Sequence, residues 1–385
     1  MLPLLGVKVV ELGTVLMAPY ASQWLADFGA DVIKVEPPAG DSTRRTGITA
    51  EPNMAAMFLN VNRNKRGIVL DLKTQVGRQA LLRLVDEADI LIQNTRPQKM
   101  KKLGLDPAAL LARNPRLIYA SFNGFGEAGP YGGRPAYDDV IQGMCGMVNL
   151  MDQNLGTPRY VPSPIADKTA GLIGAIAVLA ALRKRDCTGI GSHVEIPMFE
   201  TMVSFTAVEH FSGSHYVPAR GPAAYTRVMS PERRPFATAD GYICAVPYTD
   251  KHWRSLFSEC QRYDLLGDTR FQNMAARTDN TSALYGVLAG ILITRTTGEW
   301  VEIFDRLEIP FGPIAALAEL VHDPQLQATG FFTNIASAGS GAVRFPGVPI
   351  LFDGERPPIR MAPQLGQHTS EVLDHGGWPP QDAAD

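Results

Sequence analysis

Short apolar runs that alternate with helical segments constrain the fold of this chain more than any other feature of its sequence. Such runs, typical of strands, occur at 7–12, 31–36, 67–72, 88–94 and 117–122, and the segments 20–28 and 74–87 have helical patterns. Strands that alternate with helices predict a parallel, doubly wound α/β sheet, whose ligands bind beyond the carboxyl ends of the strands. The residues at these ends are Thr14–Met17, Asp41–Arg45, Lys73 and Asn94–Arg96.

The second half of the chain has a different organisation. A strand at 193–196 and a helix at 197–211 are followed by a loop-like stretch at 212–234, a hairpin at 238–246 and helices between 250 and 320. The residues expected in the core of these helices are Trp253, Leu256, Phe257, Leu284, Leu288, Trp300 and Phe304. This pattern indicates a second, smaller domain. Strands return at 335–336 and 342–345, and the tail after Trp378 is predicted to be disordered.

A nearly uninterrupted run of small and aliphatic residues, 169–182, predicts a helix buried on all sides, of about 14 residues and therefore too short to span a bilayer. Asp167 stands where its first turn should begin. One interpretation is that Asp167 is only an N-cap, because aspartate is among the preferred capping residues. The other is that its carboxylate is a nucleophile in a dry pocket. This stretch alone leaves both open.

Composition narrows the function classes. The 385 residues are 45% hydrophobic and carry a net charge of −3, so the chain can build a sizeable core but has no basic field for nucleic acid or an anionic membrane. The N-terminus lacks the pattern of a signal peptide. Four scattered cysteines fit a reduced, cytoplasmic protein, and seven scattered histidines give no metal-ligand spacing. We expect no metal, no nucleic acid and no membrane as partners.

The segment Gly124–Gly129 matches the GxGxxG pattern of dinucleotide-binding proteins and follows a strand. That fingerprint has to open a helix in the first βαβ unit, whereas this one follows the fifth strand and is followed at once by Pro130, Gly132, Gly133 and Pro135. We therefore predict a glycine-rich loop and no NAD site.

Taken in order, motifs over the first 205 residues resemble those of the family III CoA-transferases, which include formyl-CoA and carnitine CoA-transferases. The longest is Leu-Ala-Asp-Phe-Gly-Ala-Asp-Val-Ile-Lys-Val-Glu-Pro at 25–37. The other matching stretches are 18–19, 40–41, Arg44, 62–67, 70–73, 88–89, Asn94, 96–97, 114–119, 124–130, 136–138, 166–167, 180–182, Arg185 and 188–191.

The resemblance implies a fold that the residues alone do not predict. Members of the family are interlocked homodimers, with the active site between the large and small domains at the dimer interface. The large, Rossmann-like α/β domain is built from both chain termini and the smaller domain is α+β. For this chain the expected plan is 1–210 for the CoA-binding domain, 211–236 for a linker, 237–325 for the small domain and 326–385 for a segment that returns to the large domain.

The resemblance also implies roles for individual residues. Asp167 matches the nucleophilic aspartate, which forms an acyl–aspartyl anhydride and then an aspartyl-CoA thioester while coenzyme A moves from an acyl-CoA donor to a carboxylic acid. Helix-terminal N–H groups are candidates to hold the developing oxyanion. Coenzyme A, or acyl-CoA, is a substrate here. The residues carried over to its binding are Val15, Arg44, Leu70, Lys73, Asn94 and Lys102, with Tyr137 and Asp138 near the thioester.

Other interpretations of these residues stay open. Lys73 and Lys102 fit surface lysines and Asn94 fits a turn residue. Tyr137 fits a core position, and Asp138 with Asp139 fits a solvated pair.

The chain departs from formyl-CoA transferases at two places. Leu16 stands where those enzymes have a glutamine, and 221–229 replaces their glycine-run flap, which argues against formate or oxalate as substrates. We hypothesise that Arg227 recognises the distal carboxylate of a succinate-like diacid; a solvated loop arginine is the alternative. The alternative function is a 2-methylacyl-CoA racemase with Asp167 as a base, but that family has histidine where this chain has Tyr137.

Overall fold

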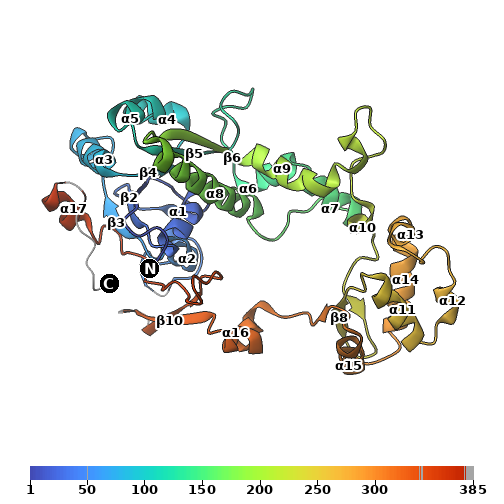
Figure 1. Ribbon diagram of the computed structural model, residues 1–385. Coiled ribbons are helices and arrows are strands. Elements are labelled where there is room, and N and C mark those ends of the chain that lie inside the picture. The colour runs from blue at the N-terminus through green and yellow to red at the C-terminus, as the bar shows by residue number, and fades with distance from the viewer. Residues whose placement is uncertain (50, 338, 340, 377, 379–385) are drawn as a thin grey trace. The chain divides into compact units, whose positions relative to one another are not determined.

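The computed structural model describes residues 1–49, 51–337, 339, 341–376 and 378, and these form two compact units (Figure 1). The large unit contains Met1–Cys145, Tyr160–Phe205 and Asp323–Asp385, so it takes both ends of the chain. The smaller unit contains Gly146–Arg159 and Thr206–His322. The segment 211–236, which we expected to be a linker, therefore belongs to the smaller unit. So does helix α7 (Met147–Leu155), although it lies in sequence between two segments of the large unit.

A parallel sheet forms the centre of the large unit, as the alternating pattern predicted. Its strands, in spatial order, are β3 (Arg66–Val69), β2 (Asp31–Glu36), β1 (Lys8–Glu11), β4 (Ile90–Gln93), β5 (Ile118–Asn123) and β6 (Ser192–Pro197). Val9 pairs with Val32 on one side and with Ile90 on the other, so β1 and β4 are neighbours at the point where the strand order reverses. Ligands of doubly wound sheets bind at this position.

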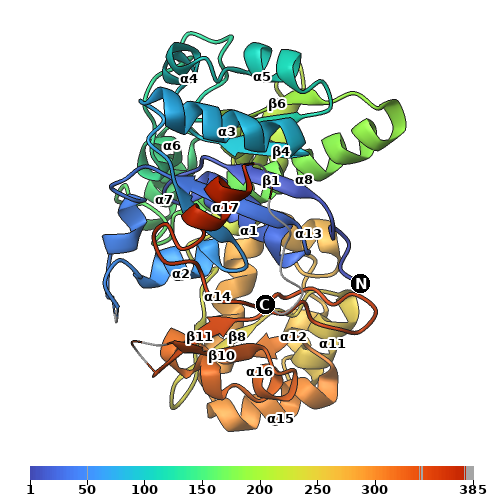
Figure 2. The same ribbon diagram turned by 90° about the vertical axis from the view of Figure 1, so that its left-hand side faces the viewer.

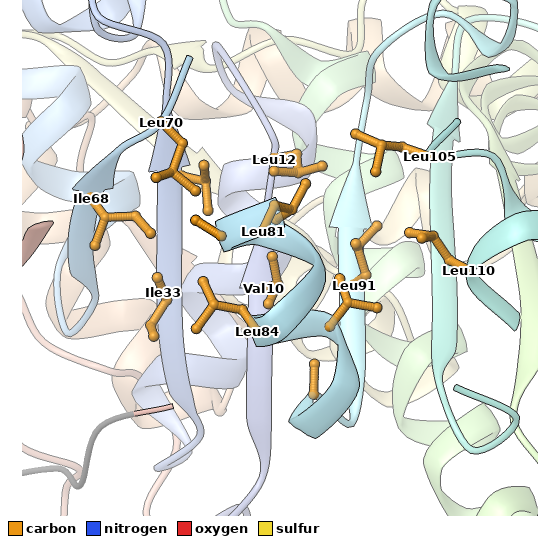
Figure 3. Close-up of a cluster of buried hydrophobic side chains, with 14 of the residues drawn as sticks. Val10, Leu12, Ile33, Ile68, Leu70, Leu81, Leu84, Leu91, Leu105 and Leu110 are labelled. Atoms are coloured by element: carbon orange, nitrogen blue, oxygen red, sulfur yellow. The ribbon is translucent and has the colours of Figure 1, made fainter. Parts of the chain in front are cut away.

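Helices cover both faces of this sheet. Figure 3 shows α3 (Gln75–Glu87) placing Leu81 and Leu84 over Val10 and Ile33 of the strands. The same face carries α4 (Pro97–Leu103) and α5 (Pro107–Arg113). The opposite face carries α1 (Met17–Asp27) and α8 (Ile165–Thr188), which pack against each other. This second layer presents the first turn of α8 to the end of the sheet.

Helix α8 corrects two expectations. It has 24 residues, not about 14, and it is therefore long and apolar enough, by length and composition alone, to cross a membrane, a test that buried helices of soluble proteins also pass. One face is buried because Gly171 and Gly174 let the backbone approach α1 and the ring of Phe122 closely. The other face is exposed in the single chain, where Ile173 and Ile176 are 45% and 62% accessible.

The end of the chain returns to the large unit. The strands β10 (Phe332–Ser337) and β11 (Gly341–Pro346) pair with each other, and Phe345 packs with Phe58 of α2 (Ala56–Asn62). Helix α16 (Pro324–Ala328) precedes them, and α17 (Thr369–His375), drawn in red in Figure 2, contacts β3. The tail beyond Trp378, predicted to be disordered, lies outside the described residues.

The smaller unit has its own hydrophobic core. A short antiparallel sheet of β7 (Phe236–Ala237), β8 (Tyr242–Ala245) and β9 (Phe311–Gly312) packs with helices, and the seven core residues predicted for these helices are all buried. The main helices are α11 (Asp250–Glu259), α14 (Thr281–Leu292) and α15 (Thr297–Leu307). Its shorter helices are α10 (Thr226–Met229), α12 (Tyr263–Leu266) and α13 (Met274–Asp279).

Candidate active site

A cavity of about 220 Å³ lies at the reversal point of the sheet in the large unit. Its walls are the loop Thr14–Met17 after β1, the residues Asn94, Arg96 and Pro97 after β4, and the glycine-rich loop after β5. Asp167 completes the lining from the first turn of α8. The cavity is therefore at the carboxyl end of the strands, where the sequence predicted a site.

Asp167 is not the N-cap of α8. The N-cap is Pro164, and Asp167 is the third helical residue, so the interpretation of Asp167 as only an N-cap is wrong. Burial raises the pKa of Asp167 to about 7 from its ordinary value of 3.8, and the negative charge of Asp138 adds to this shift. Near neutral pH about half of these carboxyl groups are ionised. A partly dehydrated carboxylate of raised basicity is suited to attack a carbonyl carbon.

A backbone N–H in the first turn of α8 is bonded by the carboxylate of Asp138, which lies in the first turn of α6 (Asp138–Met144). Its Oδ1 accepts the backbone N–H of Asp167 at 2.8 Å, and its Oδ2 accepts Nε2 of Gln142 at 2.7 Å. Gln142 also accepts the N–H of Val161. Asp138 is thus a buried partner of Asp167, not one of a solvated pair. Because the Asp167 N–H is used in this way, it is not free to hold an oxyanion.

Side-chain clamps hold the two loops that face Asp167. Asn94 accepts the N–H of Thr14 at 3.0 Å and donates to its carbonyl at 2.8 Å, which ties the end of β4 to the end of β1. The next residues, Val15 and Leu16, line the cavity, and Leu16 is buried as the N-cap of α1. The structure therefore brings Val15, Leu16, Asn94 and Asp167 together around one cavity.

Two arginines also line the cavity. Arg96 is the N-cap of α4, and Arg134 lies over the ring of Tyr131, with its guanidinium carbon 4.7 Å from the ring centroid. Arg134 was not among the predicted site residues. It belongs to the loop that follows β5, so the rule that ligands bind at strand carboxyl ends would have identified it. Guanidinium groups at such positions suit carboxylate or phosphate ligands.

Four of the predicted CoA-binding residues are outside the set that lines this cavity. Arg44 is fully buried: its guanidinium binds both oxygens of Glu36 and the carbonyls of Asn53 and Pro363. These contacts give Arg44 a structural role. Because its guanidinium is already bonded to Glu36 and to two carbonyls, it does not fit the expected contact with a phosphate of coenzyme A. Leu70 is buried in the core cluster beneath α3. Lys73 and Lys102 are exposed, so their predicted contacts stay predictions.

The remaining predicted residues differ in their surroundings. Tyr137 lines the cavity and is 71% exposed, so it is not a core residue. Arg227 belongs to the smaller unit, where its Nε donates to the hydroxyl of Tyr285 at 3.1 Å and its guanidinium lies over Tyr248. Its proposed contact with a diacid stays a prediction.

The glycine-rich segment does not open a helix. It follows β5 as an irregular loop, and the next helix begins at Asp138, so the prediction of a loop is confirmed. Within the described part of the chain, no group of three or more histidine, cysteine, aspartate or glutamate side chains is placed to hold a metal ion. The four cysteines, all described, are free thiols.

These features define an α/β protein with a cavity at the carboxyl end of a parallel sheet, lined by one aspartate of raised pKa. The chain belongs to CoA-transferase family III, whose family model matches residues 4–369. It is 33% identical over 387 residues to the probable fatty acyl-CoA transferase Rv3272 of Mycobacterium tuberculosis, with 96% of this chain and 97% of that protein covered.

Two further similarities extend over nearly the whole chain. The succinate–glutarate CoA-transferase of Agrobacterium fabrum is 33% identical over 383 residues, covering 96% of this chain and 95% of that protein. The crystal structure of a CAIB/BAIF family protein from Brucella suis superimposes with a TM-score of 0.81 at 33% identity, covering 97% and 99% of the two chains. The enzyme is therefore a CoA-transferase, a class that uses acyl-CoA as substrate.

Proposed function

We propose that this enzyme transfers coenzyme A from an acyl-CoA donor such as succinyl-CoA to a small dicarboxylic acid, through covalent intermediates on Asp167. The observation that carries the proposal is the placement of Asp167 at the cavity wall with a pKa raised to about 7 by burial and by Asp138. The carboxylate is basic enough to attack an acyl group and is ionised in a large fraction of molecules at neutral pH.

The chemistry runs through two kinds of intermediate. An oxygen of Asp167 attacks the thioester carbonyl, the C–S bond breaks, and an acyl–aspartyl anhydride and the CoA thiolate form. The thiolate then attacks the aspartyl carbonyl, which releases the donor acid and leaves an aspartyl-CoA thioester. The acceptor carboxylate and the thiolate repeat these steps in reverse, so no net proton is consumed. The anhydride requires exclusion of water, which a partly closed cavity favours.

The acidic nature of the substrates is supported by the cations of the site. Arg96 and Arg134 give the cavity two guanidinium groups for the phosphates of coenzyme A or for a substrate carboxylate. Arg227 is the further candidate for a distal carboxylate. The relative from Agrobacterium fabrum is named for succinate and glutarate, which are both dicarboxylic acids.

We propose further that the chain forms the interlocked homodimer of its family and acts in the cytoplasm. The apolar face of α8, with Leu172, Ile173 and Ile176 exposed, supports burial against a second chain. Light scattering coupled to gel filtration tests this. Ile176→Asp should prevent assembly of the dimer when the denatured chain is refolded, whereas Val76→Asp, at a 75% exposed position of α3, should not.

Mass spectrometry tests the chemistry directly. After incubation with succinyl-CoA, the peptide that contains Asp167 should gain the mass of coenzyme A, or should become a hydroxamate when hydroxylamine is added. Asp167→Ala should give neither product. If a panel of acyl-CoAs gives no adduct but 2-methylacyl-CoA exchanges its α-proton, the racemase is the correct function.

Substrate preference tests the role of Arg227. We expect Arg227→Ala to raise KM for dicarboxylates and to leave KM for monocarboxylates unchanged. Arg220→Ala is the matched control, because Arg220 also lies over a tyrosine ring, that of Tyr216. Unchanged preference in Arg227→Ala would remove this residue from the substrate site.

A further inference from the structure

Val15, in the wall of the cavity, has a backbone conformation that its side chain disfavours. Its φ is +68°, in the left-handed region, where β-branched residues are rare because Cβ crowds the backbone. Such a residue persists only where its surroundings hold it in place. The conformation matters for the site, because it turns the chain sharply from β1 into α1 and sets Val15 and Leu16 against the cavity.

A buried carboxylate holds this turn. Asp41, which is 1% exposed, accepts the N–H of Val15 with its Oδ2 at 3.2 Å. Its Oδ1 accepts both the N–H and the hydroxyl of Thr43, at 3.0 and 2.8 Å. Its own N–H donates to Glu36 at 2.8 Å. Asp41 is therefore fixed in position and orientation before it meets the turn.

Lys34 connects the same carboxylate to the other side of the turn. Its ammonium group, which is fully buried, contacts Gly13 O at 2.8 Å, Asp41 Oδ2 at 3.2 Å and Glu11 Oε1 at 3.0 Å. All three of its protons thus have acceptors. Burial by itself would lower the pKa of Lys34, but the charges of Glu11 and Asp41 outweigh burial and hold the pKa above its ordinary value of 10.5. The ammonium group stays charged.

We infer that Asp41, backed by Lys34, is a positioning residue of the active site that holds Val15 in the left-handed conformation and so presets the wall that meets the acyl-CoA. The inference rests on the proposed function for the identity of the substrate. Asp41 is outside the set of residues that lines the cavity and acts through the turn at 13–15. Without the clamp, Val15 leaves the left-handed region in a fraction of the molecules, and apparent affinity for acyl-CoA falls by that fraction.

A double-mutant cycle tests the inference. Asp41→Asn places an amide N–H₂ opposite the N–H of Val15 and the ammonium of Lys34 while the contacts of Oδ1 remain. We expect KM for succinyl-CoA, and Kd for CoA measured by calorimetry, to rise about tenfold, with a smaller change in kcat. Val15→Gly removes the conformational penalty, because glycine adopts positive φ freely. In the Val15→Gly background, Asp41→Asn should therefore change KM and Kd less than about twofold.

Two controls separate positioning from loss of stability. Asp27→Asn disturbs another buried carboxylate, which binds Arg63 and Asn64 away from the cavity. It should lower the unfolding temperature without raising KM, and Val15→Gly should not compensate for it. Thr43→Val is the milder variant if Asp41→Asn does not fold. It removes one hydroxyl donor to Asp41 and should raise KM by a smaller factor that Val15→Gly again abolishes.

The outcomes are distinct. An equal rise in KM and Kd in both backgrounds, or no rise after Asp41→Asn, would overturn the positioning role. Absence of transferase activity in the unmodified enzyme would instead refute the proposed function, and the calorimetric Kd would still decide whether Asp41 acts through Val15.

Discussion

Replacing Asp167 by asparagine should stabilise the folded protein most at alkaline pH, and by progressively less as the pH falls toward about 4. The pKa of this carboxyl is raised to about 7 in the folded chain, against an ordinary value of 3.8. Between these values the folded chain binds more protons than the unfolded chain, so the free energy of unfolding falls as pH rises. The destabilisation is complete above about pH 7 and absent below about pH 4, and asparagine removes it.

The size of the effect follows from the shift. A difference of about three units corresponds to about 4 kcal/mol, since one unit is about 1.36 kcal/mol. Two features of the site reduce this figure. The carboxylate lies in the first turn of α8, where the helix dipole favours a negative charge by about 0.3–1 kcal/mol, and Asp167 is only partly buried, so solvent screens its charge. At pH 5 the unfolded carboxyl is already mostly ionised, so part of the effect is present there, and we expect Asp167→Asn to stabilise by about 1–2 kcal/mol more at pH 8.5 than at pH 5.

Unfolding free energies measured in urea at both pH values, for the unmodified protein and the variant, give this difference directly. Asp139→Asn is the matched control, because Asp139 is an exposed carboxylate beside Asp138 on α6. Its effect should stay within about 0.5 kcal/mol at both values. A stabilisation by Asp167→Asn that is equal at both pH values, or larger at pH 5, would refute a raised pKa as the basis of nucleophilicity.

Three further predictions concern the scaffold of the site. Gly174→Ala places a methyl group 2.2 Å from the ring of Phe122, and it should lower the unfolding free energy by about 1–3 kcal/mol and slow turnover, as urea unfolding and steady-state kinetics will measure. Glu11→Gln breaks two buried ion pairs and should destabilise by about 3–5 kcal/mol, whereas Asp86→Asn, at an exposed pair, should cost less than about 1 kcal/mol in the same assay. Asp138→Asn removes the charge beside Asp167, so the acidic limb of the kcat/KM–pH profile should move to lower pH; an unchanged limb would assign the whole pKa shift to burial.

Much of the large unit could be predicted from patterns along the chain. The strands β1, β2, β4 and β5 lie where short apolar runs predicted them, because burial on both faces imposes such runs on parallel strands. The end of β3 was placed three residues too late, at Leu72 instead of Val69, because the apolar pattern continues beyond the last paired residue. The site at the carboxyl ends of β1 and β4 follows from the same topology.

The charged residues were harder to interpret. Arg44 in a loop at a strand end has the composition of a phosphate ligand, but its guanidinium is saturated by Glu36 and by carbonyls, one of them from Pro363 near the other end of the chain. Asp138 fitted a solvated pair, but the structure buries it against the start of α8, where it accepts the N–H of Asp167 from 29 residues later in the chain. Local sequence does not report which charges meet in space.

The sequence by itself determined the class of fold and the end of the sheet at which the cavity lies, and it predicted Asp167 as the nucleophile, because hydrophobic periodicity and motifs can be read along the chain. The tertiary structure alone decided the chemical state of that aspartate and the shape of its surroundings. The raised pKa of Asp167 depends on burial and on a carboxylate 29 residues earlier in the chain. The left-handed turn at Val15 depends on Asp41 and Lys34. These effects act over a few ångströms through space, and no local pattern encodes them.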